Sequence, residues 1–378
     1  MAVLTEEQSM LRDSARAWTQ EKSPVSAFRK VRDSGGPLGY DPAAFAEMAQ
    51  MGWAGVIIPE EYGGSNFGYL SLGLILEETG RTLTASPLLA TAAAAASAII
   101  LGGSERQKET WLPKIAAGEV VATLAVDEKP HHAPHTIALA AKRDGEGYRL
   151  SGAKTFVLEG MAAGLFIVSA RTSGAENDKD GITLFLVEAG AKGLGRKALK
   201  LADSRGAASL TFEDVHLGSD AILGEEGKGW ELLEKTLDRA RAALTAEMLG
   251  AAVQAFETTL DYLKTRVQFG QVIGAFQALQ HRAAKMFTDL ELARSCVEAA
   301  LTAIDNDSPE TAELVSLAKA KVGDTLHLVS NEMVQMHGGI GMTDAHDAGL
   351  YLKRARAAEA TFGNQSYHRD RYARLQGY

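Results

Sequence analysis

The sequence predicts a mainly helical protein with a β domain in its middle: an N-terminal helical domain, then an antiparallel barrel or sandwich, then a C-terminal helical bundle. Apolar residues recur at helical spacing up to about residue 118 and again from about 221. Between these regions, short strand-like runs are separated by glycine, aspartate and asparagine. Several short strands without intervening helices favour antiparallel pairing. We therefore expect domains at residues 1–118, 119–220 and 221–378.

The first domain is predicted from helix-start signals. Thr5–Gln8 resembles a capping box, and Asp41-Pro42 places proline at the first position of another helix. Ser104 caps a short helix that ends near Gly118. The longest apolar run, Leu88–Leu101, is mostly alanine and is shorter than the roughly 20 residues that a bilayer requires, so it predicts close helix packing.

The β domain and the last domain are predicted from changes in the spacing of apolar residues along the sequence. The strand-like runs lie at residues 120–126, 136–142, 148–151, 165–170, 182–187 and 208–215. From Gly227 to Thr265 the pattern is that of one amphipathic helix, roughly 58 Å long at about 1.5 Å per residue. Further helices are expected at about 275–305, 309–337 and 345–362.

Composition narrows the class of protein. The chain has 378 residues, 46% hydrophobic and 23% charged, which is an ordinary balance for a globular protein. The net charge of −9 argues against a general nucleic-acid binder, because neutralising phosphates requires a basic surface. No run predicts a membrane span, and Met1–Glu7 is an acidic helix start rather than a leader. The single cysteine, Cys296, fits a reducing compartment, so we expect a cytoplasmic protein.

Two segments of the last domain hold the residue types that bind a diphosphate. One runs from Arg266 to Gly270 and continues at Gln277, and the other is the stretch from Gln335 to Gly341. Each joins an arginine or glutamine to glycine, so a side-chain donor stands beside accessible backbone N–H groups. Arg266 and Phe269 are expected one helical turn apart, with the ring as a flat apolar face. Either segment alone would fit a turn or an arginine beside a core ring.

Together, and in this order within a helical half, the two segments resemble the acyl-CoA dehydrogenase family, and the resemblance covers the whole chain. It implies a C-terminal four-helix bundle, FAD as cofactor and an acyl-CoA thioester as substrate. It also implies like or sister subunits in a dimer or tetramer, and an electron acceptor for the reduced flavin. By this resemblance, Arg266, Phe269 and Gln277 contact FAD across a subunit interface, and Gln335, Gly338 and Gly339 meet its diphosphate and ribityl region.

The stretches that the resemblance places at the flavin ring differ from the family pattern. Asp127 stands where the family has a threonine, and a like charge would disfavour an anionic reduced flavin. Phe156 can still cover a ring, whereas Leu158 lacks the hydroxyl that the family offers there. The ring site is therefore predicted to be either remodelled or empty. Its candidate contacts are Val126, Asp127, Phe156, Leu158 and Asn364.

Three histidines, His131, His132 and His135, follow in the same loop. Imidazoles are common zinc ligands, but no cysteine or carboxylate cluster accompanies them. The sequence therefore favours a solvated loop over a metal site, and no metal is predicted.

The glutamate that the family uses as a base is absent from both of its places. Ala240 occupies one, and Phe362 occupies the other. Removing the α-proton of a thioester needs a positioned base. Glu247 lies seven residues after Ala240, on the same helix face about 10.5 Å along the axis, among small and apolar neighbours that favour a neutral carboxyl unless a cation pairs with it. Glu247 is the candidate base, and a structural glutamate bonded inside the bundle is the alternative.

Three more charged residues have two interpretations each. Glu359 is a weaker candidate base, and an ion pair with Arg356 or a solvated carboxylate is favoured for it. Asp238 and Arg241 match the family residues that meet the nucleotide side of coenzyme A. The alternative is an exposed pair on a charged helix start.

These observations leave three functions open. The first is α,β-dehydrogenation of an acyl-CoA thioester with electrons passed to FAD. The second is a non-catalytic subunit that completes the FAD site of a catalytic sister in a hetero-oligomer, as in relatives that process steroid side chains. The third is a flavin enzyme of other chemistry on the same fold, to which no residue points positively.

Overall fold

The computed structural model describes residues 4–378, so the first three residues of the acidic start lie outside the described residues. The chain forms two compact units. The first contains the chain up to Arg29, Gly73–Thr84 and Arg241–Tyr378, and the second contains Lys30–Leu72 and Ala85–Ala240. These units divide the chain at other positions than the three domains expected from the sequence, whose boundaries stay a prediction.

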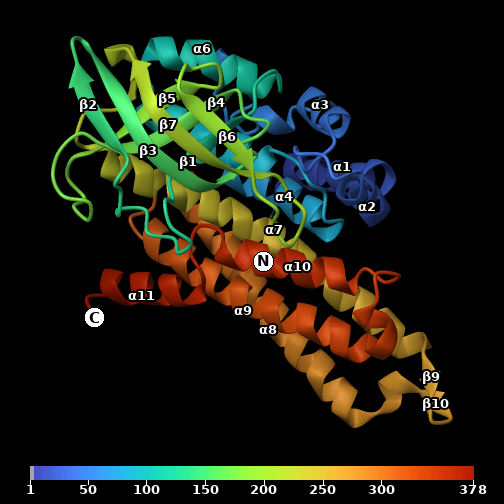
Figure 1. Cartoon of the computed structure of the whole chain (residues 1–378). Coiled ribbons are helices and arrows are strands. Elements are labelled where there is room, and N and C mark those ends of the chain that lie inside the picture. Colours follow the sequence, from blue (N-terminus) through green and yellow to red (C-terminus); the bar gives the residue numbers. More distant parts are fainter. Residues whose placement is uncertain (1–3) are drawn as a thin grey trace. The chain divides into compact units, whose positions relative to one another are not determined.

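The first unit is built from helices (Figure 1). Thr5 caps its first helix, and both hydrogen bonds of the expected capping box are present, because Gln8 N donates to Thr5 Oγ1 and Thr5 N donates to Gln8 Oε1. The short hairpin of β9 and β10 joins α7 to α8 (Figure 1). The elements lying wholly or partly in this unit are α1 (Glu6–Lys22), α2 (Val25–Ser34), α4 (Gly68–Arg81), α7 (Gly229–Thr265), β9 (Val267–Gln268), β10 (Gln271–Val272), α8 (Gln277–Asp305), α9 (Thr311–His337), α10 (Ala348–Ala360) and α11 (Gln365–Leu375).

Helices α4 and α7 cross with their backbones in contact. A Cβ atom placed on Gly80 would lie 2.0 Å from the carbonyl oxygen of Glu247, and one on Gly250 would lie 1.8 Å from that of Glu77. Only glycine can occupy positions where another backbone approaches so closely. The crossing therefore fixes the stretch of α7 that holds Glu247 against α4.

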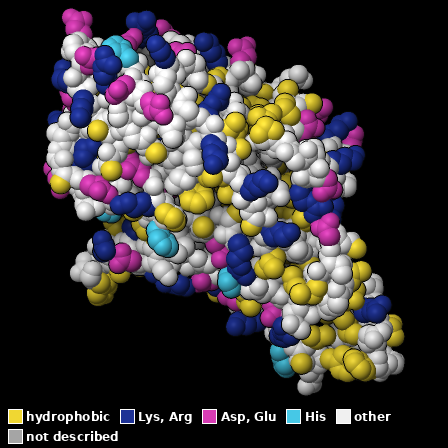
Figure 2. Space-filling view, viewed as in Figure 1, with side chains coloured by type: hydrophobic (Ala, Val, Ile, Leu, Met, Phe, Trp, Pro, Cys, Tyr) yellow, Lys and Arg dark blue, Asp and Glu magenta, His cyan; other side chains and the backbone are white. Residues whose placement is uncertain are grey.

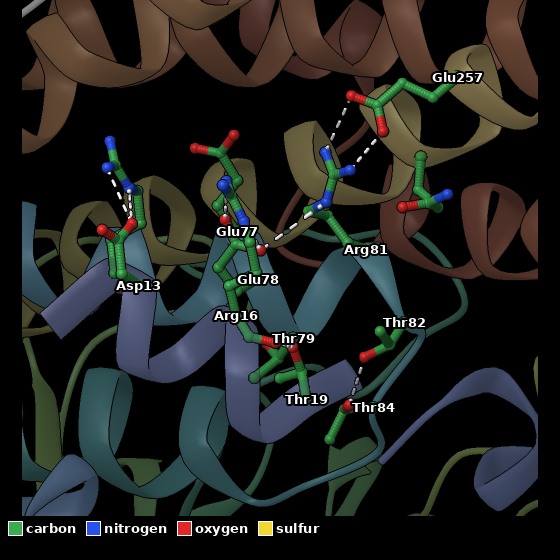
Figure 3. Close-up of polar contacts among 12 residues, drawn as sticks. Asp13, Arg16, Thr19, Glu77, Glu78, Thr79, Arg81, Thr82, Thr84 and Glu257 are labelled. Carbon is green, nitrogen blue, oxygen red and sulfur yellow. Dashed lines mark hydrogen bonds and ion pairs between the residues drawn. The ribbon is translucent and has the colours of Figure 1, made fainter. Parts of the chain in front are cut away.

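Charged side chains connect α1, α4 and α7 near this crossing (Figure 3). Arg16 Nη2 lies 2.8 Å from Glu78 Oε1, and Arg81 Nε lies 3.7 Å from Glu78 Oε2. Arg81 also pairs with Glu257 on α7. Because Glu78 is buried, removing either arginine would leave a poorly compensated charge.

The second unit combines short helices with a β-sheet. In residues 4–378, eight strands form one sheet in the order β6-β7-β3-β2-β4-β5-β8, with β1 beside β4. Most neighbouring strands are antiparallel, as expected, but β1 pairs with β4 in parallel and β2 meets β4 in parallel at one residue pair. The strands are β1 (Ala122–Ala125), β2 (Ala140–Asp144), β3 (Gly147–Leu158), β4 (Leu165–Arg171), β5 (Ile182–Glu188), β6 (Leu194–Ala198), β7 (Ala207–Leu217) and β8 (Ile222–Leu223).

The alanine run forms two helical segments beside this sheet, with α3 (Pro42–Gln50) and α6 (Glu105–Ala116) as the other α-helices wholly within this unit. A π-helix, η3 (Leu89–Ala95), leads into α5 (Ala96–Gly102), and Thr91 Oγ1 donates to the carbonyl of Ala122 on β1 at 2.9 Å. Its alanines are buried, which agrees with close packing. Of the helices in residues 4–378, none has both the length and the apolar character needed to cross a membrane.

Candidate functional site

Three phenylalanines at predicted site positions have a left-handed backbone. The φ angles are 52° for Phe156, 53° for Phe269 and 56° for Phe362. A bulky residue with positive φ is an outlier that costs about 1–3 kcal/mol and persists only where its surroundings impose it. Six other described non-glycine residues share this backbone, among them Leu83 and Glu159, so positive φ does not by itself mark these positions as functional.

The β9–β10 hairpin presents Arg266 and Phe269 at the end of the bundle. Helix α7 ends at Thr265, so the expectation that these residues lie one helical turn apart is wrong. The two-residue loop Phe269-Gly270 has positive φ at both positions, as a tight hairpin of this twist requires, and this requirement ends the helical pattern. Phe269 is 90% exposed, and within residues 4–378 the Arg266 guanidinium makes no hydrogen bond or ion pair.

The glycine segment is equally open. Gln335 is exposed on the last turn of α9, and Gly338 follows with φ 61°. A Cβ atom at Gly338 or Gly339 would meet no atom within 4 Å. The backbone here is therefore accessible to a ligand, and Gln277 is exposed at the start of α8. These residues fit the diphosphate of FAD by their chemistry, with amide and guanidinium donors beside uncovered backbone, while their individual roles stay predictions.

Large apolar side chains are exposed around the hairpin. Figure 2 shows hydrophobic side chains gathered over this end of the bundle. An exposed apolar surface of this kind marks a place of protein or ligand contact. The exposed side chains on the hairpin, on the first part of α8 and on the turn after α9 are Val267, Phe269, Val272, Phe287, Leu292, Ile340 and Met342.

The loop after β1 folds over Asp127. His132 Nδ1 lies 3.0 Å from both carboxylate oxygens of Asp127, and Ala133 N donates to one of them at 3.3 Å. His135 packs edge-on against Trp230. Only His131 of the three histidines is exposed, so the expected solvated loop is wrong for the other two. Within residues 4–378 no three metal-ligating side chains gather as a metal site would need.

Two buried cations that the sequence did not single out organise this loop. Lys154 Nζ donates to the carbonyl of Val126 at 2.9 Å and to Glu128 at 2.7 Å, and burial lowers the pKa of Lys154. The guanidinium of Arg171 donates to backbone carbonyls of His135 and Ile137, among others. Arg171 ends β4 and its guanidinium donates to backbone carbonyls, whereas Lys154 lies inside β3 and also pairs with a carboxylate, so residue type and spacing did not reveal either one.

Phe156 stands at a bulge of β3. The pairing with β7 shifts register between Lys154 and Val157, and Phe156 is 46% exposed. Bulges re-aim side chains and are frequent beside functional sites. Of the other predicted ring contacts, Val126 is buried and Leu158 is half-buried. An exposed, strained aromatic ring agrees with the predicted role of covering a flavin, which stays a prediction.

Glu247 forms a buried ion pair. Arg354 on α10 donates to Glu247 Oε1 from Nε at 3.0 Å and from Nη2 at 2.9 Å, and Glu247 is 3% exposed. The argument for a base assumed that no cation pairs with this carboxyl, and Arg354 does. The arrangement supports the alternative of a structural glutamate. Ala240, at one of the family's base positions, is fully buried on the same helix.

The remaining charged candidates are occupied within the fold. Glu359 pairs with Arg356 Nη1 at 3.0 Å, which confirms the favoured interpretation. Asp238 and Arg241 are both buried, so the alternative of an exposed pair is wrong. Arg241 donates from Nε to the carbonyl of Phe362 at 3.2 Å. For Arg241, contacts with the segment after α10 accompany this burial, and helix periodicity alone does not show them.

A pocket of about 870 Å³ lies elsewhere in the second unit. Residues of α6, such as Trp111, and of the end of β7, such as His216, line it. None of the predicted site residues borders this pocket. It is therefore separate from the candidate cofactor positions.

Comparison with known proteins covers nearly the whole chain. Family models described as acyl-CoA dehydrogenase N-terminal, middle and C-terminal domains match residues 5–119, 131–216 and 227–376. Acryloyl-CoA reductase (NADH) of Anaerotignum propionicum is 31% identical to this chain. The match covers 97% of this chain and 93% of the length of that relative. The structure of butyryl-CoA dehydrogenase from Megasphaera elsdenii gives a TM-score of 0.92 at 27% identity and covers 100% of both chains. A steroid ACAD structure, Tcur3481-Tcur3483, gives 0.88 at 31% identity and covers 98% of both. The chain belongs to the acyl-CoA dehydrogenase family.

Proposed function

We propose that this chain acts as an FAD-dependent acyl-CoA dehydrogenase-type flavoprotein, which removes hydrogen from the α and β carbons of an acyl-CoA thioester. Membership of the family supports the reaction class and the cofactor. The observation that carries the proposal is the open surface at the end of the bundle. There, Arg266 has no partner among residues 4–378, Phe269 is almost fully exposed, and the backbone at Gly338 and Gly339 is uncovered.

These residues have distinct roles in the proposal. Arg266 would donate to a phosphate of FAD, and the N–H groups near Gly338 would meet the diphosphate from a second side. Phe269 and Gln277 would complete this grip for a neighbouring subunit. Bound FAD supplies the acceptor for the hydride that leaves the β-carbon. Phe156 would exclude water from the ring, and Asp127, held by His132, would stand beside it.

Coenzyme A binding and proton removal are less complete in this chain. Asp238 and Arg241 are proposed to serve the nucleotide side of coenzyme A, and Asn364 the flavin, as the resemblance implies. For the proton, Glu247 is the remaining candidate. A base must be free to reach the α-carbon, so Arg354 would have to release Glu247 Oε1 before this carboxyl could act.

A second function is favoured by the same ion pair. A non-catalytic subunit would complete the FAD site of a catalytic sister and would need no base. This chain keeps the exposed hairpin, whereas Ala240 and Phe362 cannot accept a proton and Glu247 is engaged by Arg354. The likeness to a steroid ACAD supports such a pair as a model for assembly.

One experiment separates the two functions. The chain is purified alone, its flavin absorbance is measured per chain, and its mass in solution is determined. One FAD per chain in a homo-oligomer that oxidises acyl-CoA thioesters supports the enzyme. Little FAD, restored only by co-expression with a sister chain of the same family, supports the non-catalytic subunit. A flavin-free monomer in both preparations contradicts both functions.

The source of the substrate, the electron acceptor, the assembly and the compartment are proposed from the resemblance to the family. Degradation of fatty acids or of steroid side chains would supply the acyl-CoA thioester. An electron acceptor would reoxidise the reduced flavin, in a homo- or heterotetramer located in the cytoplasm. Turnover with straight-chain and steroid-derived thioesters, compared side by side, tests the choice of substrate.

A further inference from the structure

Lys319 is buried in α9 and points its ammonium group at backbone oxygens alone. Its Nζ donates to the carbonyls of Ala358 at 3.1 Å, Glu359 at 3.0 Å and Gly363 at 2.9 Å. The last carbonyls of a helix have no partner inside the helix and carry partial negative charge. Lys319 therefore caps the end of α10 and holds the residues that follow it.

The carbonyl of Phe362, which lies between these acceptors, is held by two more buried side chains. Arg241 on α7 donates to it from Nε at 3.2 Å, and His368 on α11 lies with Nε2 at 3.0 Å. Both donors are fully buried. Four carbonyls in six residues are thus bound by side chains from three separate helices.

The turn itself is closely packed. Gly363 has φ 102°, and a Cβ atom there would lie 2.5 Å from Cδ1 of Tyr367 and 2.9 Å from Nε2 of His368. Asn364 accepts a hydrogen bond from Tyr367 N at 2.9 Å and so caps α11. Phe362 itself has φ 56°. Because the residues before and after it are held by the contacts above, the position of its Cα is fixed.

This arrangement is costly for the folded protein. Arg241 and Arg354 repel the Lys319 ammonium and Glu359 attracts it, while burial is the largest influence, and together these lower the Lys319 pKa to about 7. Burial, with Arg241 and Lys319 nearby, keeps the His368 pKa far below its usual value. A helix end needs only a glycine or water to satisfy its carbonyls. Three buried donors converge on this one turn, so a change in any of them is expected to move residue 362.

We propose that Lys319 is a positioning residue, which acts with Arg241 and His368 to fix the Thr361–Asn364 turn so that the Phe362 side chain forms part of the wall of the acyl-CoA site. The inference rests on the proposed function. It adds a role for three residues that act through the turn. It also accounts for a turn with many hydrogen bonds although the side chain at residue 362 cannot move a proton.

The test compares Lys319→Met with the pair His368→Leu and His368→Gln, because glutamine keeps a donor near the place of Nε2. All variants are made in the assembly that binds FAD, with or without a sister subunit. Acyl-CoA affinity is measured by calorimetry with straight-chain thioesters from butyryl-CoA to palmitoyl-CoA, and the tightest binder of the wild-type protein is carried forward. Hydrogen exchange of residues 357–366 is compared with that of α8.

We expect Lys319→Met and His368→Leu to raise exchange in the turn by about tenfold or more, with α8 unchanged, and to weaken acyl-CoA binding about tenfold at equal FAD content. His368→Gln should restore most of both properties. Faster exchange with unchanged acyl-CoA affinity would overturn the positioning role, and so would exchange that rises equally in α8. If Lys319→Met does not fold, the His368 pair decides alone. A wild-type protein that binds no acyl-CoA at all defeats the proposed function itself, which separates that failure from a failure of the positioning role.

Discussion

The β9–β10 hairpin and the Thr361–Asn364 turn lie in the same compact unit, and each contains a phenylalanine with a left-handed backbone. Their surroundings are opposite. Phe269 is 90% exposed, and Arg266 beside it has no partner in residues 4–378. At the turn, Lys319 and Arg241 donate to carbonyls of the same chain. The hairpin therefore leaves its ring and cation exposed, whereas the turn is held by contacts within the chain.

This difference agrees with the proposed division of the site between the hairpin and the turn. The part that would serve a neighbouring subunit remains open, with exposed cation, ring and backbone. The part that would deprotonate a substrate is closed by internal pairs, of which Glu247 with Arg354 is the clearest. Mutations should therefore act on ligand binding at the hairpin and on stability at the turn and its surroundings.

The largest effect is expected for Glu247→Gln. It leaves the buried Arg354 with a neutral partner, so the free energy of unfolding should fall by about 3 kcal/mol. Glu257→Gln, on the exposed end of the same helix, is the control and should change stability by about 1 kcal/mol or less. Chemical denaturation measures both. Unchanged stability together with abolished turnover would restore Glu247 as the base.

Gly363→Ala should destabilise by roughly 2–3 kcal/mol, because it combines positive φ with a clash against Tyr367. The matched control is Gly339→Ala, where a Cβ meets no atom within 4 Å. That control should leave thermal unfolding of the FAD-free protein almost unchanged and should weaken FAD retention. Equal destabilisation by the two variants would contradict the claim that the turn at Gly363 is tightly packed and the segment at Gly339 is open.

Arg266→Ala should weaken FAD binding by about tenfold to a hundredfold, the range expected for one charge-assisted contact to a phosphate. Stability of the FAD-free chain should not change, since the side chain has no partner in residues 4–378. Lys264→Ala, which removes a cation from the end of α7, serves as control. Equilibrium dialysis with FAD gives the affinities, and equal FAD affinity in the wild type and Arg266→Ala would exclude this arginine from the cofactor site.

The smallest effect concerns pH. The Lys319 pKa is about 7 in the folded chain, below the ordinary lysine value of 10.5, so between these values the unfolded state binds more protons and stability rises with pH. This group adds at most about 1.4 kcal/mol per pH unit. Denaturation curves at pH 7, 8 and 9 give the free energy of unfolding at each pH. This free energy should rise less steeply with pH for Lys319→Met than for the wild type. Parallel slopes would mean that Lys319 remains charged over this range.

Prediction from sequence succeeded where a local signal is strong. The capping box at Thr5 and the long helix ending at Thr265 are observed as expected. It failed where the signal is short or ambiguous. The five-residue β6 and the two-residue β8 were missed, and the helical pattern was extended across Arg266 although a hairpin begins there.

The amino-acid sequence by itself determined the order of helical and strand segments, the glycines that keep the backbone open near residue 338, and the loss of glutamate at positions 240 and 362, because these depend on residue type and local spacing. Only the tertiary structure decided that Glu247 pairs with Arg354, that the Asp127 carboxylate contacts the His132 ring, and that Lys319 donates to carbonyls at the end of α10. These contacts depend on how closely helices and loops approach one another. Side-chain partners that are backbone carbonyls leave no trace in the pattern of residue types, so no periodicity reveals them.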